Sequence, residues 1–268
     1  MKSLSRLPSG STRVCPLCGK NNFATFLQKQ DLRLVRCRDC SMIFANPVPA
    51  EMVSGSFYDK ARTPFYLSPE KLESDYASVR FERELNLFRR FCSTGSVLDV
   101  GCSTGAFLYQ LKNRFPNFYR GTGTDISQSA LEYARSRGVE IVAGSFLDFQ
   151  FGEQRFDAIT FWAVMEHLLE PRKFLEKAAS LLQRGGHCFI LVPNLNSLAV
   201  RILGAKYRYL LPEHVNYFTA QSLEKFTQAE PLLEIVRRGS MHLNPLVIAQ
   251  DWRGSGALVS DHERAALL

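Results

Sequence analysis

The chain has 268 residues, 46% of them hydrophobic, which is enough for one full α/β domain and a small additional module. Its net charge of +7 comes from lysines and arginines spread along the chain, so we expect a solvated basic surface and do not favour nucleic acid as a partner. No stretch resembles a signal core or a bilayer span, so we expect no membrane partner. Seven cysteines, three of them isolated, argue against a secreted disulfide framework and predict a cytoplasmic protein.

Two C-x-x-C pairs lie near the N-terminus, with eighteen residues between them. Each pair delivers two thiolates from one tight turn, and tetrahedral zinc takes four such ligands. The spacing therefore predicts a structural Zn2+ ribbon over residues 14–48, with short strands at 23–26 and 32–35. The predicted zinc ligands are Cys15, Cys18, Cys37 and Cys40.

The segments beside the ribbon carry weaker patterns. Residues 1–13 are rich in serine and are expected to be disordered, and residues 49–70, with prolines and unpatterned aromatic residues, predict an irregular connector. From Pro69 to Cys92, apolar residues recur at helical spacing, which predicts one continuous helix. The opposite face of that helix carries Tyr76 and Arg80.

The stretch from Ser96 to Leu108 reads as a strand, a glycine turn and a helix. In an open α/β sheet, this order of elements places a nucleotide-sized site at the carboxyl ends of the strands. The turn runs from Gly101 to Gly105, and it contains neither the G-x-G-x-x-G fingerprint nor a P-loop lysine. Because Asp99 puts a carboxylate beside the turn, we expect a cationic ligand rather than a pyrophosphate.

This pattern resembles motif I of the class I S-adenosyl-L-methionine-dependent methyltransferases. Asp99, Gly101 and Gly105 follow one strand, and the acid Asp125 ends the next. The resemblance covers residues 75–250 and implies an α/β, Rossmann-like sheet of seven strands, six parallel and one antiparallel. It also implies S-adenosyl-L-methionine as the cofactor. The last two strands are expected at 232–236 and 246–249.

The resemblance further implies roles for individual residues around the cofactor. Asp125 would accept hydrogen bonds from the ribose diol, although the same residue would also suit an N-terminal cap of the next helix. Asp148 would lie near the adenine amino group with Phe146 or Leu147 against the ring; a surface loop is the alternative for Asp148. The predicted cofactor-binding set is Tyr76, Arg80, Asp99, Gly101, Cys102, Ser103, Gly105, Asp125, Ile126, Phe146, Leu147, Asp148, Phe161 and Trp162.

Three residues are candidates for work on the methyl acceptor. The pair Glu166-His167 follows the strand expected at 156–161 and resembles a characteristic pair of small-molecule methyltransferases. An ordinary histidine titrates near ~6.5, which suits a general base, but the pair equally predicts a hydrogen-bonded helix start that shapes the pocket. His214 lies in residues 194–218, which resemble an insert that roofs the acceptor pocket. It is either a second base or an exposed loop histidine.

These patterns divide the chain into successive parts and favour one function. The parts are a disordered N-terminus (1–13), a zinc ribbon (14–48), a connector (49–70), a methyltransferase domain (71–250) with an acceptor-side insert (194–218), and a tail (251–268). The preferred function is methyl transfer to a small-molecule acceptor, such as a sugar, a nucleotide-linked sugar or another biosynthetic intermediate.

Two other functions stay open at the level of the sequence. One is a zinc-ribbon rRNA or tRNA base methyltransferase, although Trp162-Ala-Val-Met stands where enzymes of exocyclic base amines carry Asn/Asp-Pro-Pro-Tyr/Phe. The other is a non-catalytic zinc-ribbon adaptor with a vestigial methyltransferase domain. The retained acids and glycines of the motif count against this adaptor. The sequence predicts no particular oligomeric state.

Overall fold

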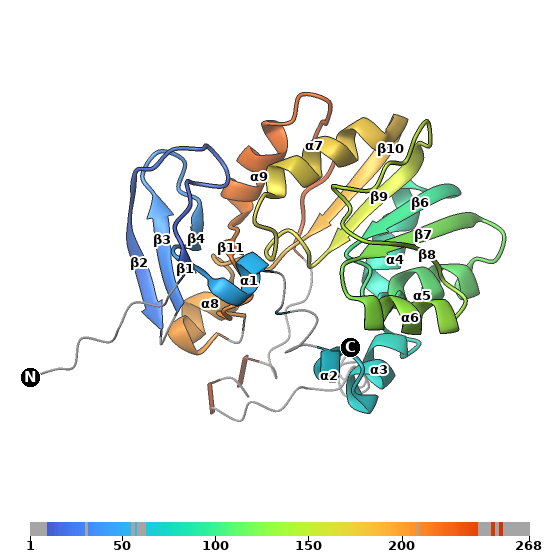
Figure 1. Cartoon of the computed structure of the whole chain (residues 1–268), viewed down its shortest axis with the longest axis horizontal. Coiled ribbons are helices and arrows are strands. Elements are labelled where there is room, and N and C mark those ends of the chain that lie inside the picture. Colours follow the sequence, from blue (N-terminus) through green and yellow to red (C-terminus); the bar gives the residue numbers. More distant parts are fainter. Residues whose placement is uncertain are drawn as a thin grey trace, which may run out of the picture.

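The computed structural model of the chain describes residues 10–29, 32–54, 57, 63–207, 209–240, 248–249 and 252–253. A small sheet near the N-terminus and a larger central sheet lie on either side of helices α7 (Pro171–Leu181) and α9 (Ala220–Gln228) (Figure 1). Within the described residues, no helix combines the length and the apolar character needed to cross a membrane.

The central sheet has five strands, all parallel, in the order β10-β9-β6-β7-β8. Its strands are β6 (Gly95–Val100), β7 (Tyr119–Asp125), β8 (Glu140–Ala143), β9 (Phe156–Trp162) and β10 (Leu182–Leu191). The chain builds outward from β6 to β8 and then returns past β6 to add β9 and β10 on the other side. The carboxyl ends of β6 and β9 therefore flank the point where the strand order reverses, and ligands of open α/β sheets bind at such points.

Alternate residues of the central strands point to opposite faces of the sheet and enter two separate cores. Val97 and Ala158 pack in the core on one face, and Leu98 and Ile159 pack in the other core with residues of α7 and α9. The helices of the first face are α4 (Glu82–Phe91), α5 (Ala106–Arg114) and α6 (Gln128–Ser136). Both faces are thus covered, as is usual for parallel sheets.

The cysteine-rich region forms a four-stranded antiparallel sheet in the order β11-β4-β3-β2, which we call the ribbon sheet. Its strands are β2 (Phe23–Lys29), β3 (Leu32–Cys37), β4 (Ile43–Ala45) and β11 (Asn216–Tyr217). The two strands expected between the C-x-x-C pairs are confirmed as β2 and β3. β11 belongs to the expected insert, and its Asn216 pairs with Phe44 of β4. The ribbon sheet therefore contains a strand from a distant part of the chain.

The segments on either side of the ribbon are more ordered than the sequence predicts. β1 (Gly10–Ser11) pairs with β5 (Val48–Pro49), so residues 10–13 do not form the expected disordered tail, and residues 1–9 lie outside the described part. A Cβ atom on Gly10 would lie 2.0 Å from the carbonyl oxygen of Val48, so this pairing requires glycine. The connector contains the short helices α1 (Ala50–Ser54) and α2 (Thr63–Tyr66).

The helix expected over residues 69–92 is split into α3 (Pro69–Tyr76) and α4. Phe81, directly before α4, has a φ of 64°, which a continuous helix does not allow. The side-chain amide of Gln110 donates hydrogen bonds to the carbonyl oxygens of Tyr76 (3.0 Å) and Ala77 (3.1 Å). These bonds satisfy acceptors that are left over at the end of α3.

The expected final hairpin does not form in the described part of the chain. Residues 232–236 contain no strand, and Leu232 and Val236 are 70% and 65% exposed. Of residues 246–249, only 248–249 are described, and they are helical. The expectation of seven strands with one antiparallel is therefore wrong for the described residues, where the central sheet has five parallel strands. Leu233 of this segment packs against the core that contains α7 and α9, whereas Leu232 and Val236 stay exposed.

Candidate cofactor and acceptor site

The four cysteines of the two C-x-x-C pairs converge at the end of the ribbon sheet. The Sγ atoms of Cys15 and Cys40 are 3.4 Å apart, those of Cys18 and Cys37 are 3.6 Å apart, and all four lie within 4.8 Å of one another. Tetrahedral zinc with Zn–S bonds of about 2.3 Å needs sulfur atoms about 3.8 Å apart. The donor set and its spacing therefore fit a structural zinc ion.

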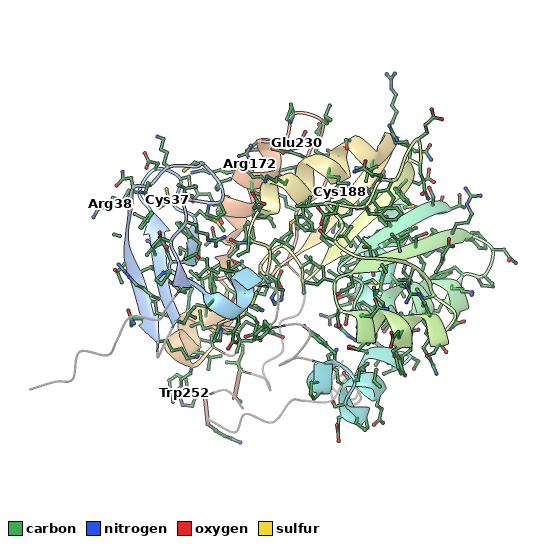
Figure 2. The ribbon with its side chains drawn as sticks, viewed as in Figure 1. Cys37, Arg38, Arg172, Cys188, Glu230 and Trp252 are labelled. Carbon is green, nitrogen blue, oxygen red and sulfur yellow. The ribbon has the colours of Figure 1, made fainter. Side chains whose placement is uncertain are left out.

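α7 holds the ribbon against the larger part of the molecule. Arg172, in the first turn of this helix, donates from Nη1 to the carbonyl oxygen of Leu17 (2.7 Å), between the two cysteines of the first pair. Figure 2 labels Arg172 between the ribbon residue Cys37 and Glu230, which follows α9. The cysteine cluster is thereby fixed relative to the central sheet.

The glycine turn after β6 carries a buried carboxylate at its start. Asp99 is 3% exposed and accepts a hydrogen bond from Oγ1 of Thr160 (2.6 Å) on the neighbouring strand β9. Burial raises the pKa of Asp99 to about 7, outweighing the hydrogen bond from Thr160, which lowers it. A Cβ atom on Gly101 would lie 2.7 Å from Cγ2 of Val164, so the turn requires glycine there.

Asp125, at the end of β7, joins the glycine turn to the start of α6. Its Oδ2 accepts from the backbone N–H of Ser103 (2.9 Å) and its Oδ1 from the backbone N–H of Ser127 (2.9 Å). Burial raises the pKa of Asp125, while these backbone hydrogen bonds lower it. Each carboxylate oxygen has a second lone pair that a ribose hydroxyl can use, so capping and ribose binding are compatible.

Other residues of the predicted cofactor set lie around these two acids. Tyr76 donates from its hydroxyl to the carbonyl oxygen of Thr104 in the glycine turn (2.5 Å). Ile126 follows Asp125 and is 50% exposed, whereas the guanidinium of Arg80 lies over the ring of Phe81 (4.3 Å). The structure therefore brings Tyr76 and Ile126 to the turn and directs Arg80 towards α4.

The loop after β8 differs from the sequence-based expectation. Phe146 is buried in the core, where its ring packs against Phe151, Phe161 and Phe174. Of the two residues expected against the adenine, Phe146 is therefore held within the core by three aromatic rings, and Leu147 is half-buried beside it. The same core holds Phe161, which is fully buried, and Asp148 is exposed on the loop.

Two residues near the turn have side chains that pack rather than project. Sγ of Cys102 would lie 2.6 Å from a Cβ atom on Gly123, which shows that this thiol fills the space beside β7. Trp162 packs between Phe107 and Phe189, and its Nε1 is buried with no hydrogen-bond partner among the described residues. Both side chains therefore fill space inside the protein near the carboxyl ends of the strands.

The acceptor candidates gather at the end of β9. Ligand atoms of Glu166, His167 and His214 all lie within 4.8 Å of one another, and we call these three residues the acceptor cluster. The two imidazole rings have centroids 4.6 Å apart and are nearly perpendicular. His214 is 6% exposed, so the alternative of an exposed loop histidine is wrong.

Hydrogen bonding and burial define the chemistry of the acceptor cluster. Nδ1 of His167 lies 3.0 Å from the carbonyl oxygen of Glu213. Because a carbonyl oxygen only accepts, Nδ1 carries the proton and Nε2 of neutral His167 presents a lone pair. Glu166 is 2% exposed, neither of its carboxylate oxygens has a hydrogen-bond partner in the described part of the chain, and burial raises its pKa to about 8.

Two residues outside the predicted site, Asn216 and Arg13, join the loops that carry the acceptor cluster. The side-chain amide of Asn216 donates to the carbonyl oxygens of Met165 (2.8 Å) and Leu168 (2.7 Å). Arg13 donates to the carbonyl oxygens of Leu169 (3.2 Å) and Val215, so it bridges the same two loops. The sequence pointed to neither Asn216 nor Arg13 directly, and the one indication was that Asn216 follows His214 by two positions.

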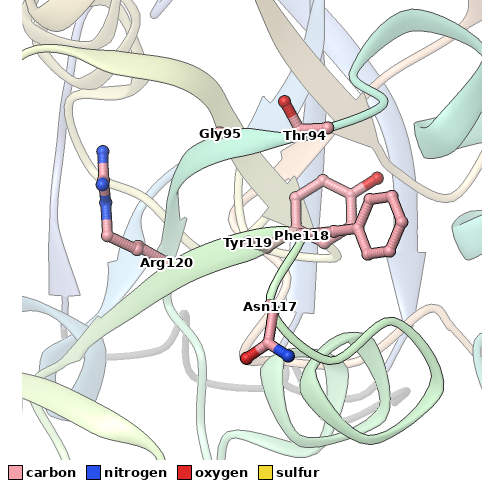
Figure 3. Close-up of a pocket in the computed structure, with 6 residues that line it drawn as sticks. All are labelled: Thr94, Gly95, Asn117, Phe118, Tyr119 and Arg120. Atoms are coloured by element: carbon pink, nitrogen blue, oxygen red, sulfur yellow. The ribbon is translucent and has the colours of Figure 1, made fainter.

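A depression of about 540 Å³ lies at the other end of the central strands (Figure 3). It is lined by Thr94, Gly95, Asn117, Phe118, Tyr119 and Arg120. β6 and β7 begin at this edge, whereas the glycine turn follows the carboxyl end of β6. Because open α/β sheets bind their ligands at the carboxyl ends, this depression is not the candidate site.

Comparison with known proteins agrees with this geometry. Residues 74–229 match the family described as "Methyltransferase domain". The ubiquinone biosynthesis O-methyltransferase of Vibrio atlanticus (strain LGP32) is 30% identical over 166 residues, which cover 56% of this chain and 68% of that protein.

Solved structures of methyltransferases are also similar to this chain. The plantazolicin methyltransferase BpumL in complex with SAH aligns with a TM-score of 0.50 at 16% identity, over 77% of this chain and 90% of that one. CalS10, an amino pentose methyltransferase from Micromonospora echinaspora, is 28% identical over 42% of this chain and half (50%) of its own, with a TM-score of 0.38. Because the family model matches more than half of the chain and the Vibrio relative is 30% identical, the chain belongs to the methyltransferase-domain family and is an S-adenosylmethionine-dependent methyltransferase.

Proposed function

We propose that the chain transfers the methyl group of S-adenosylmethionine to a hydroxyl oxygen of a small biosynthetic molecule. The acceptor cluster is the observation that carries this proposal, because it gathers proton-accepting groups beside the strand-order reversal. The name of the Vibrio relative, an O-methyltransferase of ubiquinone biosynthesis, supports oxygen as the acceptor atom and a small molecule as its carrier.

The residues after β6 and β7 suit the cofactor. The carboxylates of Asp99 and Asp125 give this edge a negative potential, and the backbone from Gly101 to Gly105 allows close approach. Asp125 would accept hydrogen bonds from the ribose, with Ile126 beside the adenine. When bound, S-adenosylmethionine supplies a methyl group on a cationic sulfonium.

The acceptor cluster prepares the hydroxyl that attacks. In the balanced reaction an oxygen–methyl bond forms, the sulfur–methyl bond breaks with its electron pair on sulfur, and the hydroxyl proton is lost. The lone pair on Nε2 of His167 suits this step, because it can take either a proton or a cation that acidifies the hydroxyl. The buried loops around Glu166 and His214 exclude water from the reacting groups.

Methyl transfer from labelled S-adenosylmethionine tests this function. Catechols, sugar nucleotides and bulk RNA serve as competing acceptors, and the variant His167→Asn is compared with His187→Asn, which changes a histidine on β10 outside the acceptor cluster. We expect labelled small molecules, and a rate that falls by about a hundredfold or more only in His167→Asn. Nuclease-sensitive labelling of RNA would instead support the base methyltransferase, and calorimetry without cofactor binding would support the adaptor.

We also propose that residues 14–48 form a ribbon that binds one structural zinc ion. The sulfur spacing of Cys15, Cys18, Cys37 and Cys40 supports zinc. Metal analysis of the purified protein should find one zinc ion per chain that survives mild chelation. Its loss in Cys18→Ser is the expected control result.

A further inference from the structure

Glu166 has an environment that methyl transfer by itself does not explain. Its side chain is 2% exposed, and both carboxylate oxygens lack a hydrogen-bond partner within the described residues. A buried carboxylate without a partner is energetically costly, and buried charges in folded proteins are paired or coordinate metals. The surroundings of Glu166 therefore favour a cationic partner.

The other two residues of the acceptor cluster complete a donor set for such a cation. Each of the three side chains offers a ligand atom, and these atoms lie within 4.8 Å of one another. We propose that Glu166, His167 and His214 bind a divalent transition-metal cation on the acceptor side of the active site. Two imidazoles and one carboxylate are a donor set that first-row cations accept.

His167 is oriented for this role by its other ring nitrogen. Nδ1 donates to the carbonyl oxygen of Glu213 (3.0 Å), which leaves the lone pair of Nε2 as the ligand. Metal-binding histidines almost always donate their second nitrogen in this way, because the bond fixes the tautomer and the ring orientation. The outer hydrogen bond of a metal site is thus already present.

The backbone that carries the ligands is also fixed. The carbonyl oxygen of Glu166 accepts from the backbone N–H groups of Val215 (2.8 Å) and Asn216 (2.9 Å), so the segments with Glu166 and His214 are joined directly. A cation with bonds of about 2.1 Å needs donor atoms about 3 to 3.5 Å apart. The donors therefore have to close by at most about 2 Å, which side-chain torsions supply.

Three protein ligands leave coordination positions open for the acceptor. Here the inference rests on the proposed function: a cation in this position selects acceptors with two adjacent oxygens, such as catechols or vicinal diols, which chelate it. Coordination lowers the pKa of the bound hydroxyl. Its proton then passes to solvent before the oxygen–methyl bond forms and the sulfur–methyl bond breaks.

Binding of Mn2+ tests the site without any methyl transfer. Full-length protein is titrated with Mn2+, and the bound ion is counted from the loss of the free-ion signal in electron paramagnetic resonance. Mn2+ prefers oxygen and nitrogen ligands to thiolates, so the ribbon cysteines do not compete. We expect one bound Mn2+ per chain and binding at least about tenfold weaker in Glu166→Gln and His214→Asn. Glu170→Gln is the matched control, because Glu170 is 56% exposed and pairs with Lys173, so this variant should bind Mn2+ like the parent.

The outcomes separate this inference from the proposed function. Equal Mn2+ binding by Glu166→Gln and the parent overturns the inference, and so does the absence of any Mn2+, Co2+ or Zn2+ beyond the ribbon zinc. Unchanged binding of S-adenosylmethionine shows first that each variant is folded. Metal-free protein that methylates at the full rate also overturns the inference but leaves the proposed function standing. If the protein binds Mn2+ through Glu166 but transfers no methyl group to small molecules, the metal site stands and the proposed function is overturned.

Discussion

Arg13 donates a hydrogen bond of 2.5 Å from Nη2 to the carbonyl oxygen of Val215, the residue that follows His214 of the acceptor cluster. The same nitrogen donates to Oδ1 of Asn216 (2.8 Å), and Asn216 belongs to β11 at the edge of the ribbon sheet. The segment that follows His214 is therefore held by the N-terminal part of the chain through a side chain and through strand pairing. The ribbon is in this way a structural part of the acceptor site.

Arg13→Ala should weaken the acceptor site and leave the cofactor site intact. The substitution removes charged hydrogen bonds to two carbonyl oxygens and to Asn216, which predicts a loss of about 2 to 4 kcal/mol in the free energy of unfolding. We expect kcat to fall and the Kd for S-adenosylmethionine to stay within about twofold of the parent. Denaturant unfolding, turnover and calorimetry measure the three effects. Arg38→Ala, at an exposed arginine of the ribbon, is the control and should change none of them.

Loss of the zinc ion proposed for the ribbon should act on the acceptor site in the same way. Cys18→Ser removes one thiolate of the four-cysteine cluster, so β3 and β4 lose their anchor and β11 loses its partner strand. A displacement of His214 by about 1 Å is enough to lower turnover by about a hundredfold. The measurement is turnover with added Mn2+, together with cofactor affinity. Parent-like turnover in zinc-free Cys18→Ser would contradict a positioning role of the ribbon. Lys20→Ala is the control, because it changes an exposed side chain two residues after Cys18.

The strand, turn and helix on the cofactor side of the candidate site were predicted correctly because they depend on local sequence. A strand end, a carboxylate and a glycine turn are contiguous along the chain, so this local structure at Asp99 and Gly101 was predicted from their spacing, and the cofactor role proposed for them comes from the resemblance to motif I. The turn after the next strand repeats this pattern at Asp125. Backbone conformation determines the geometry of such turns, and residue type reports it directly.

The acceptor side depends on contacts between segments far apart in the sequence, and these were predicted only in part. His167 and His214 were both candidates, but no local pattern indicates that their rings approach to 4.6 Å. Arg13 was placed in a disordered tail because its partners are carbonyl oxygens more than 150 residues away, which have no sequence signature. Phe146 and Leu147 stayed alternatives for the adenine contact because the sequence does not tell which of two adjacent apolar residues enters the core, and the structure buries Phe146 there.

Gly101→Ala should destabilise the protein through two separable effects. The φ of Gly101 is +71°, and a Cβ atom there would lie 2.7 Å from Cγ2 of Val164. Gly152 has a φ of +58° with nothing near its Cβ position, so Gly152→Ala measures the backbone cost alone, about 1 to 2 kcal/mol. We expect Gly101→Ala to lose a further 1 to 3 kcal/mol or so, and Val164→Ala added to it to restore part of that extra loss. Equal losses in the two single variants would show that Val164 moves away freely.

Binding of S-adenosylmethionine should tighten as the pH rises through the pKa of Asp99. Burial raises this pKa to about 7, and a cationic ligand favours the ionised carboxylate, so binding releases a proton below neutral pH. About 9% of the carboxyl is ionised at pH 6 and about 91% at pH 8, which predicts an affinity about tenfold higher at pH 8.

In the cofactor-free protein the linkage has the opposite sign. The unfolded chain ionises Asp99 near pH 4, whereas the folded chain does so near pH 7. The contribution of Asp99 to the free energy of unfolding is therefore full below pH 4 and falls as the pH rises to about 7.

Calorimetry of S-adenosylmethionine binding between about pH 6 and pH 8 tests the predicted rise in affinity. It should give a flat affinity profile for Asp99→Asn and a parent-like profile for Glu153→Gln, which changes an exposed carboxylate. An Asp99→Asn profile that still rises tenfold would assign the titration to another group, and Asp125, whose pKa is also raised by burial, would be the next carboxylate to replace.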